Sequence, residues 1–116
     1  MSIRTLFTDA RFIGQAAGDR QTYSVFETAS GYLVAAPRAP NNYSLTFVQR
    51  AAPDVISRNF HGRQITVNSL KSRTHRPDLF GGYFDRLNAL YVMVALGKAT
   101  KLKKRMGRAM LFKIKS

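Results

Sequence analysis

The chain has 116 residues, of which 45% are apolar, and it contains no cysteine. This length and apolar content argue against a chain that is disordered throughout, and they predict one domain, or a domain with a smaller appendage. The lack of cysteine excludes disulfides, thiolate metal sites and cysteine nucleophiles.

The formal net charge is +13, and the second half of the chain carries most of it. Residues 1–50 have a net charge of +2, whereas residues 51–116 have a net charge of +11. The electrostatic field of these positive charges attracts polyanions, of which nucleic acid is the commonest in a cell. Anionic lipid and acidic protein surfaces would be attracted in the same way. The longest apolar run, residues 89–96, is far shorter than the roughly 20 residues of a membrane-spanning helix. We therefore expect a cytoplasmic protein without a membrane partner.

The first part of the chain has the pattern of antiparallel strands. β-Branched and aromatic residues alternate with polar ones between Gly, Asp, Asn and Pro turns. Residues 23–28 and 31–36 predict a hairpin in which Gly31 supplies the positive φ of the turn. Residues 43–48 predict another strand, so a small antiparallel sheet is expected within residues 3–49.

The spacing of apolar residues changes at Ala51 from about two to about 3.6, which predicts helices. The first helix is expected over residues 53–60 and begins with the proline of that segment. The second is expected to be a short helix within residues 65–73, where Thr66 or Asn68 can cap it.

A loop over residues 74–82 leads to the third helix, which is expected from Tyr83 to a C-terminal cap at Gly97. Its apolar face is formed by Phe84, Leu87, Leu90, Tyr91, Met93 and Val94. Together with Phe112 of the next segment, the residues of this face expected to be substantially buried are Leu87, Leu90, Tyr91 and Val94.

The last twenty residues, 97–116, include eight Lys or Arg and no acidic residue. Apolar residues around Phe112 alternate at the period of a strand, and Gly107 suits a turn, so residues 98–115 predict a basic β-hairpin. The competing interpretation is one helix from Tyr83 to the C-terminus, which would carry two interior glycines at a cost of about 1 kcal/mol each.

The order of these elements, from the first helix through a short extended segment to the basic hairpin, resembles the winged helix-turn-helix superfamily over residues 51–116. ITVNSLKSR resembles its second helix, FDRLNALYVMVALGKA its recognition helix, and TKLKKRMGRAMLFKI its wing. The resemblance implies that the third helix binds duplex DNA and that the wing contacts the DNA backbone. The expected fold class is α+β, with an antiparallel sheet region over residues 1–50 and a winged-helix-like basic region over residues 51–116 that closes with the hairpin.

Two groups of side chains are candidates for contact with nucleic acid. Cations at the hairpin tip can meet phosphates without being buried, and the N-terminal end of the third helix, with Tyr83, Arg86 and Asn88, is expected to reach base edges. The complete expected set is Lys71, Arg73, His75, Arg76, Tyr83, Arg86, Lys101, Lys103, Lys104, Arg105 and Arg108. The alternative is that these charges are solvent-facing and only keep the protein in solution.

Catalysis is not expected from this sequence. The two histidines, His61 and His75, lie in Arg-flanked segments with no neighbouring acid to orient them, and a phosphate contact is the expected role of His75. The six carboxylates are scattered, and neither a Gly-rich phosphate loop nor a metal-ligand spacing is present. No cofactor or metal is expected.

The leading hypothesis is a small DNA-binding protein, a regulator or an accessory factor of a mobile element or phage. Its N-terminal sheet would mediate homodimerisation or bind a protein partner. An RNA-binding or ribosome-associated protein, and a basic inhibitor or adaptor that docks on an acidic protein surface, are the two alternatives.

Overall fold

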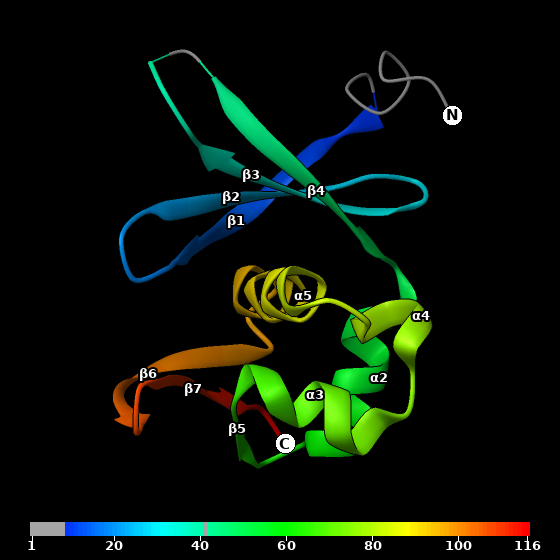
Figure 1. Ribbon diagram of the computed structural model, residues 1–116. Coiled ribbons are helices and arrows are strands. Elements are labelled where there is room, and N and C mark those ends of the chain that lie inside the picture. The colour runs from blue at the N-terminus through cyan, green and yellow to red at the C-terminus, as the bar shows by residue number, and fades with distance from the viewer. Residues whose placement is uncertain (1–8, 41) are drawn as a thin grey trace.

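Helix α5 (Tyr83–Ala95) lies at the centre of the molecule, between a four-stranded sheet and a second unit of helices and strands (Figure 1). The computed structural model describes residues 9–40 and 42–116. Its helices and antiparallel sheets confirm the predicted α+β class, with a sheet at the N-terminal side and a hairpin at the C-terminal end.

The N-terminal sheet consists of four antiparallel strands in sequence order. They are β1 (Arg11–Ala17), β2 (Thr22–Glu27), β3 (Gly31–Pro37) and β4 (Tyr43–Gln49). The predicted β2–β3 hairpin is confirmed, and Gly31 in its turn has φ +157°. A Cβ atom at Gly31 would lie 2.4 Å from the carbonyl oxygen of Val48, so the turn requires glycine.

The C-terminal unit follows the predicted order of elements. It contains α2 (Ala51–Phe60), β5 (Gln64–Ile65), α3 (Val67–Thr74), α4 (Pro77–Phe80), β6 (Ala99–Met106) and β7 (Ala109–Ile114). The three strands form a second sheet in the order β5-β7-β6. The residues that the structure describes include no helix with both the length and the apolar character needed to cross a membrane.

The helices differ from the prediction in one boundary and in one additional short helix. Helix α2 begins at Ala51, so the proline is its third residue, a position tolerated because the first N–H groups of a helix have no intrahelical partner. The predicted loop 74–82 contains the short helix α4, which Pro77 starts and Asp78 supports in the first turn.

The C-terminal end of α5 confirms the role predicted for Gly97. This residue has φ +75°, its N–H donates to the carbonyl of Val94 over 3.0 Å, and the N–H of Lys98 donates to the carbonyl of Met93 over 2.8 Å. The two bonds form a Schellman motif that ends the helix and turns the chain into β6.

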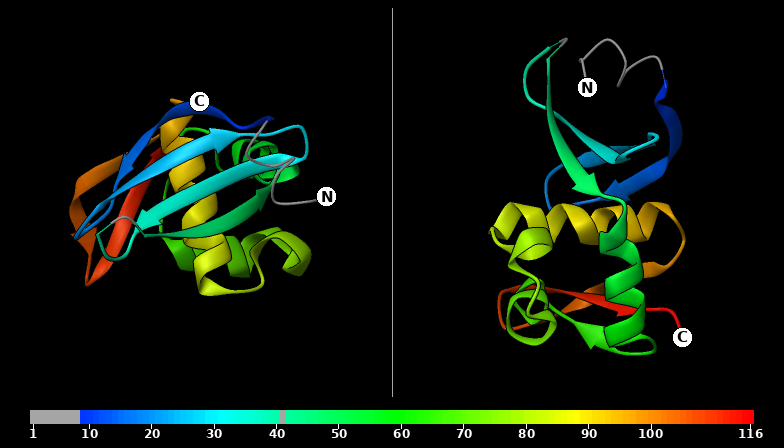
Figure 2. Two further views of the ribbon diagram at one scale, coloured as in Figure 1. Left: turned by 90° about the horizontal axis from the view of Figure 1, so that it is seen from above. Right: turned by 90° about the vertical axis from the view of Figure 1, so that its right-hand side faces the viewer.

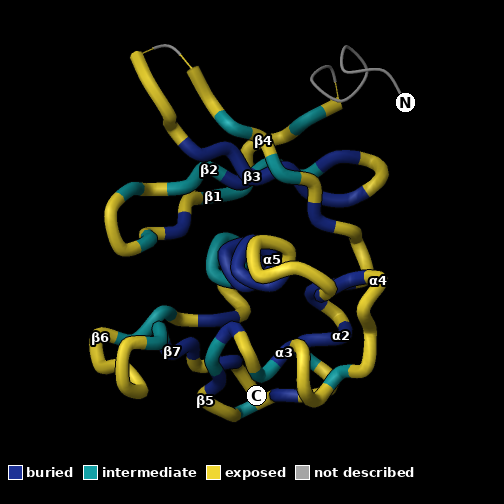
Figure 3. Tube along the Cα trace, in the orientation of Figure 1, coloured by how far each residue is buried: buried dark blue, intermediate teal, exposed yellow. Residues whose placement is uncertain are grey.

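One hydrophobic core spans both halves of the chain, because α5 contacts all four strands of the N-terminal sheet as well as α2, α3, α4 and β6. Figure 3 shows α5 as a buried segment between two layers whose outer parts are exposed. The inner face of the N-terminal sheet, which includes Val25 and Val34, packs toward α5. At Gly14 a Cβ atom would lie 3.0 Å from the carbonyl oxygen of Ala95, so glycine allows strand and helix to approach closely.

The predicted burial is confirmed for Leu87, Leu90 and Tyr91 of the third helix and for Phe112 of the hairpin. Val94 is only partly buried, and the place given to Phe84 on the apolar face is wrong, because its side chain is 69% exposed. The first turn of α5, which carries Phe84, projects beyond the edge of the four-stranded sheet (Figure 2).

Candidate nucleic-acid interface

The β6–β7 hairpin carries two kinds of cation, those already paired within the protein and those free to meet a ligand. Arg105 and Lys101 both donate to Oδ1 of Asp19 in the β1–β2 turn, over 2.5 and 3.2 Å. The hydrogen bonds from Lys101 and Arg105 lower the pKa of Asp19 below its ordinary value. These contacts join the hairpin to the N-terminal sheet and partly neutralise two of its charges.

The remaining expected cations of the hairpin are Lys103, Lys104 and Arg108, which are exposed. No hydrogen bond or ion pair links their charged groups to another residue of the described part of the chain. The register changes between Lys101, opposite Phe112, and Arg105, opposite Met110, so strand β6 bulges over residues 102–104. The bulge lies on an edge strand and displays two lysines to solvent.

Helix α3 adds a polar stripe beside the hairpin turn. Exposed side chains follow the spacing i, i+3, i+4 and i+7 at Asn68, Lys71, Ser72 and His75, and Arg73 is also exposed. A small pocket of about 120 Å³ is lined by Asn68 together with Tyr83, Arg105 and Arg108. The structure therefore gathers three expected residues, and it adds Asn68, which the sequence suggested only as a helix cap.

The other expected residues of this region lie at the opposite end of α3. His75 ends the helix in the left-handed conformation with φ 55°, and it lines a separate pocket with Lys71 and Arg76. Arg76 donates to both carboxylate oxygens of Asp78 over 3.0 and 2.9 Å, and this pairing lowers the pKa of Asp78. The expected residues thus form more than one cluster.

The expectation that Arg86 reaches a base edge is wrong for this conformation. Arg86 is only 6% exposed, and its Nη1 donates to the carbonyl oxygens of Phe80 and Gly81 over 2.9 and 3.2 Å. Its Nε is buried and has no hydrogen-bond partner among residues 9–40 and 42–116. Because α5 is covered by the sheet on one side and by helices on the other, Arg86 instead holds the turn between α4 and α5.

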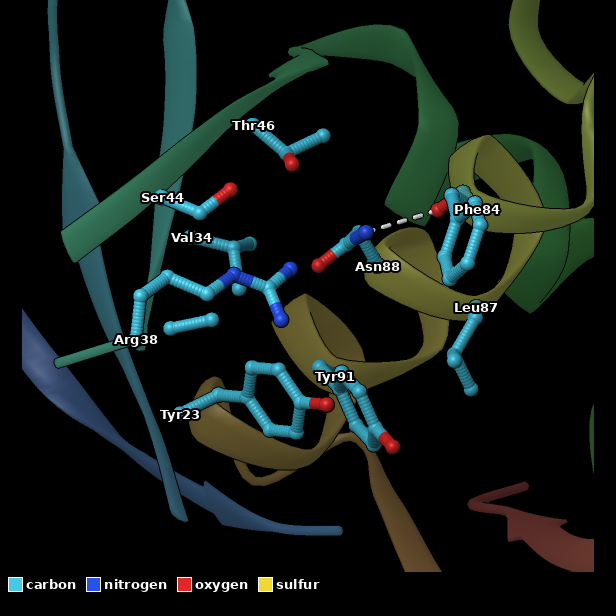
Figure 4. Close-up of a pocket in the computed structure, with 10 residues that line it drawn as sticks. Tyr23, Val34, Arg38, Ser44, Thr46, Phe84, Leu87, Asn88 and Tyr91 are labelled. Atoms are coloured by element: carbon cyan, nitrogen blue, oxygen red, sulfur yellow. Dashed lines mark hydrogen bonds between the residues drawn. The ribbon is translucent and has the colours of Figure 1, made fainter. Parts of the chain in front are cut away.

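A third pocket, of about 240 Å³, lies between the inner face of the N-terminal sheet and α5; we call it the inner pocket (Figure 4). Its lining residues are Tyr23, Val34, Ala36, Arg38, Ser44, Thr46, Phe84, Leu87, Asn88 and Tyr91. The rings of Tyr23 and Tyr91 stack with centroids 4.4 Å apart, and burial, followed by the neighbouring Tyr23, raises the pKa of Tyr91. No sequence pattern indicated this pocket, since its residues come from segments far apart in the chain.

On the outer face of the N-terminal sheet, turned away from α5, the strand rows described by the structure are mainly apolar and contain no charged residue. The strand register aligns Phe12, Phe26, Leu33 and Phe47 in one row across all four strands. The next row contains Gln15, Ser24, Ala35 and Leu45, and Tyr43 lies beyond it. Large side chains exposed on this face are Phe12, Tyr43, Leu45 and Phe47.

Within residues 9–40 and 42–116, no group of three or more His, Asp or Glu side chains is placed to hold a metal ion. The chain matches no protein-family model, no curated protein and no solved structure.

Proposed function

We propose that the protein binds nucleic acid, with duplex DNA as the preferred form, through the β6–β7 hairpin in a winged-helix-like arrangement. The observation that carries this proposal is the display of Lys103, Lys104 and Arg108, exposed and without partners in the described chain, on an edge hairpin. They belong to a region, residues 51–116, with a net charge of +11. Exposed cations on a projecting element are what phosphate contact requires, because they need not be desolvated before binding.

The proposed arrangement gives Lys101 and Arg105 a positioning role. Both are held by Asp19, so a phosphate at either cation would compete with an internal carboxylate. Their ion pairs fix the hairpin against the β1–β2 turn, and the free cations of the same hairpin remain exposed. Exposed pairs of this kind contribute little to global stability, and their value here is orientation.

Base contacts, in this proposal, come from the edge of α3 and the start of α5. Asn68 and Tyr83 line the same small pocket as Arg108, and Lys71 is one turn further along α3. Asn and Arg side chains are suited to base edges, whereas the middle of α5 is buried and supports both layers. We place the protein in the cytoplasm, where nucleic acid is accessible to it.

The proposal is tested by fluorescence anisotropy with labelled duplex DNA, single-stranded DNA and duplex RNA of equal length, each at several salt concentrations. The expected result is tightest binding to duplex DNA, with log affinity falling by about 0.9 per phosphate contact for each unit of log salt. A preference for RNA would favour the RNA-binding alternative. Failure to bind any of the three nucleic acids would refute the proposal. The remaining hypothesis would then be a protein that docks on an acidic protein surface.

We also propose a second copy of this chain as the partner of the outer face of the sheet. Two molecules that each carry a charge of +13 repel one another, yet they can meet at these strand rows without placing like charges together, because none of the described residues in the rows is charged. A two-fold axis brings the same patch of both molecules together, so the apolar row of one molecule would face the apolar row of the other. The hairpins lie at the far side of the molecule from this face, so the dimer would present them at opposite ends (Figure 1).

A further inference from the structure

The inner pocket contains hydrogen-bonding groups that the described protein does not satisfy. The guanidinium of Arg38 and the side-chain oxygen of Asn88 both point into it (Figure 4). Neither Arg38 nor the hydroxyls of Ser44 and Thr46 have a side-chain hydrogen bond to any described residue. The pocket therefore offers donors and acceptors from two layers to whatever enters it.

The orientation of Asn88 is set by its neighbour. Asn88 is 7% exposed, and its Nδ2 donates to the carbonyl oxygen of Phe84 over 2.8 Å. A carbonyl accepts but cannot donate, so the amide nitrogen must face Phe84 and the oxygen must face the pocket. Asn88 is thus a fixed acceptor, and Arg38 is a permanently charged donor on the opposite wall.

A donor on one wall and an acceptor on the other match a nucleobase, whose rim carries both N–H groups and acceptor atoms. The apolar side chains of Val34 and Leu87 line the same pocket, and the exposed ring of Phe84 at its rim offers a stacking surface. A volume of about 240 Å³ is below the roughly 300 Å³ at which pockets for drug-sized ligands begin. The size suits one ring system with part of its sugar.

The elements around the inner pocket lie near the hairpin turn. The end of β3, the β1–β2 turn and the β6–β7 turn lie on the same side of the molecule in both the front view and the view from above (Figures 1 and 2). Tyr91 lines the inner pocket, and its hydroxyl would lie only 2.9 Å from a Cβ atom at Gly18, whose chain neighbour Asp19 pairs with Arg105 of the hairpin and lines the pocket at the hairpin turn. The two sites are therefore neighbours.

We propose that the inner pocket binds an unpaired nucleobase, whose strand continues across the hairpin cations. This inference rests on the proposed function and names its substrate class: a nucleic acid with at least one base outside a base pair, such as a single-nucleotide bulge in a duplex. Phe84 stacks on the base, Asn88 accepts a hydrogen bond from one of its N–H groups, and Arg38 donates to an acceptor atom on the other side of the same base. The exposure of Phe84, unexpected from its place on the apolar helix face, is explained by this role.

The test of the pocket itself uses free mononucleotides, which do not need the hairpin. Titration of the four nucleoside monophosphates, followed by amide chemical shifts, is compared with ribose 5-phosphate, which has the same phosphate but no base. We expect shifts at Asn88 and Phe84 only with the nucleotides. Equal responses to ribose 5-phosphate, or no response at these residues, would overturn the inference and leave a pocket that holds only water.

The test in the nucleic acid compares a perfect duplex with the same duplex carrying one bulged nucleotide. The wild type should bind the bulged form more tightly, and Phe84→Ala should reduce that preference by roughly 5- to 100-fold, the range for removal of one base–aromatic stack. Phe84 is exposed, so this variant is expected to fold, and Arg38→Gln provides a second variant on the opposite wall. Arg58→Gln, an exposed cation of α2, is the matched control and should keep the preference.

The outcomes separate the two proposals. Nucleotide binding in the pocket without binding of any polymer would refute the hairpin function and retain the base site. Polymer binding with identical affinity for perfect and bulged duplexes, unchanged in Phe84→Ala, would retain the hairpin function and overturn the base site.

Discussion

Leu90→Ala probes the placement of α5 at the centre of the fold. Leu90 is 0% exposed and lies on a helix covered by the sheet on one side and by helices on the other. The substitution removes about three methylene equivalents, worth about 2.4 kcal/mol at ~0.8 kcal/mol each. A residual cavity of about 50 Å³ would add about 1.2 kcal/mol at ~24 cal/mol per Å³. We therefore expect a loss of about 3 to 4 kcal/mol in the free energy of unfolding.

The assay is urea unfolding followed by far-UV circular dichroism, because the chain contains no tryptophan. The midpoint should fall while the slope of free energy against urea stays constant, since the same surface is exposed on unfolding. Met106→Ala is the control: its side chain is 64% exposed, and we expect a loss below about 0.5 kcal/mol. A loss of less than half a kilocalorie per mole for Leu90→Ala would refute the position assigned to α5.

Three further predictions concern the turn, the ion pairs and the outer face. Gly31→Ala should destabilise the protein by at least about 1 kcal/mol more than Gly107→Ala. The Cβ atom added at Gly31 would lie 2.4 Å from a carbonyl oxygen, whereas a Cβ atom added at Gly107 would have no neighbour within 4 Å. Equal urea midpoints for the two variants would contradict this prediction. Asp19→Asn should be less stable than wild type above pH 3.8, the ordinary pKa of the carboxyl. That difference should vanish as the pH falls through the lower folded-state pKa, since protonation then removes the same ion pairs; a difference that persists in urea titrations at pH 2 would argue against them. Phe47→Lys should turn a dimer into a monomer in analytical ultracentrifugation, with the exposed Thr100→Lys as control; a wild-type monomer at all concentrations would refute the dimer.

The local features of the fold were predictable because each depends on a few neighbouring residues. Gly31, Gly97 and Gly107 occupy backbone positions with positive φ, and each marks the turn or helix end that the sequence indicated. The alternation around Phe112 correctly separated a hairpin from a continuous helix. These features depend on residues within one turn or one hairpin, so they can be predicted from the sequence without knowledge of the tertiary fold.

The arrangement around α5 was not predictable in the same way. The helix was expected to present Arg86, but this side chain folds back onto the carbonyl oxygens of Phe80 and Gly81. The sheet packs on α5 through the close approach of Gly14 to Ala95. Asp19 pairs with cations 82 and 86 residues away. The inner pocket joins Arg38 to Asn88 across two layers. These interactions join residues that are far apart in the sequence, so no local sequence pattern predicts them.

The most direct test of the central claim is the salt dependence of duplex DNA binding in two charge-matched variants. The first replaces the free hairpin cations Lys103, Lys104 and Arg108 by alanine. The second replaces the same number of exposed cations away from the hairpin tip, at Arg58, Arg63 and Lys98. Both should show wild-type circular dichroism. In the first variant the slope of log affinity against log salt should flatten by about 0.9 for each phosphate that is no longer bound, up to about 2.7, and in the second it should change little. Equal slopes in the wild type and the hairpin variant would contradict the proposal that these three side chains hold phosphates.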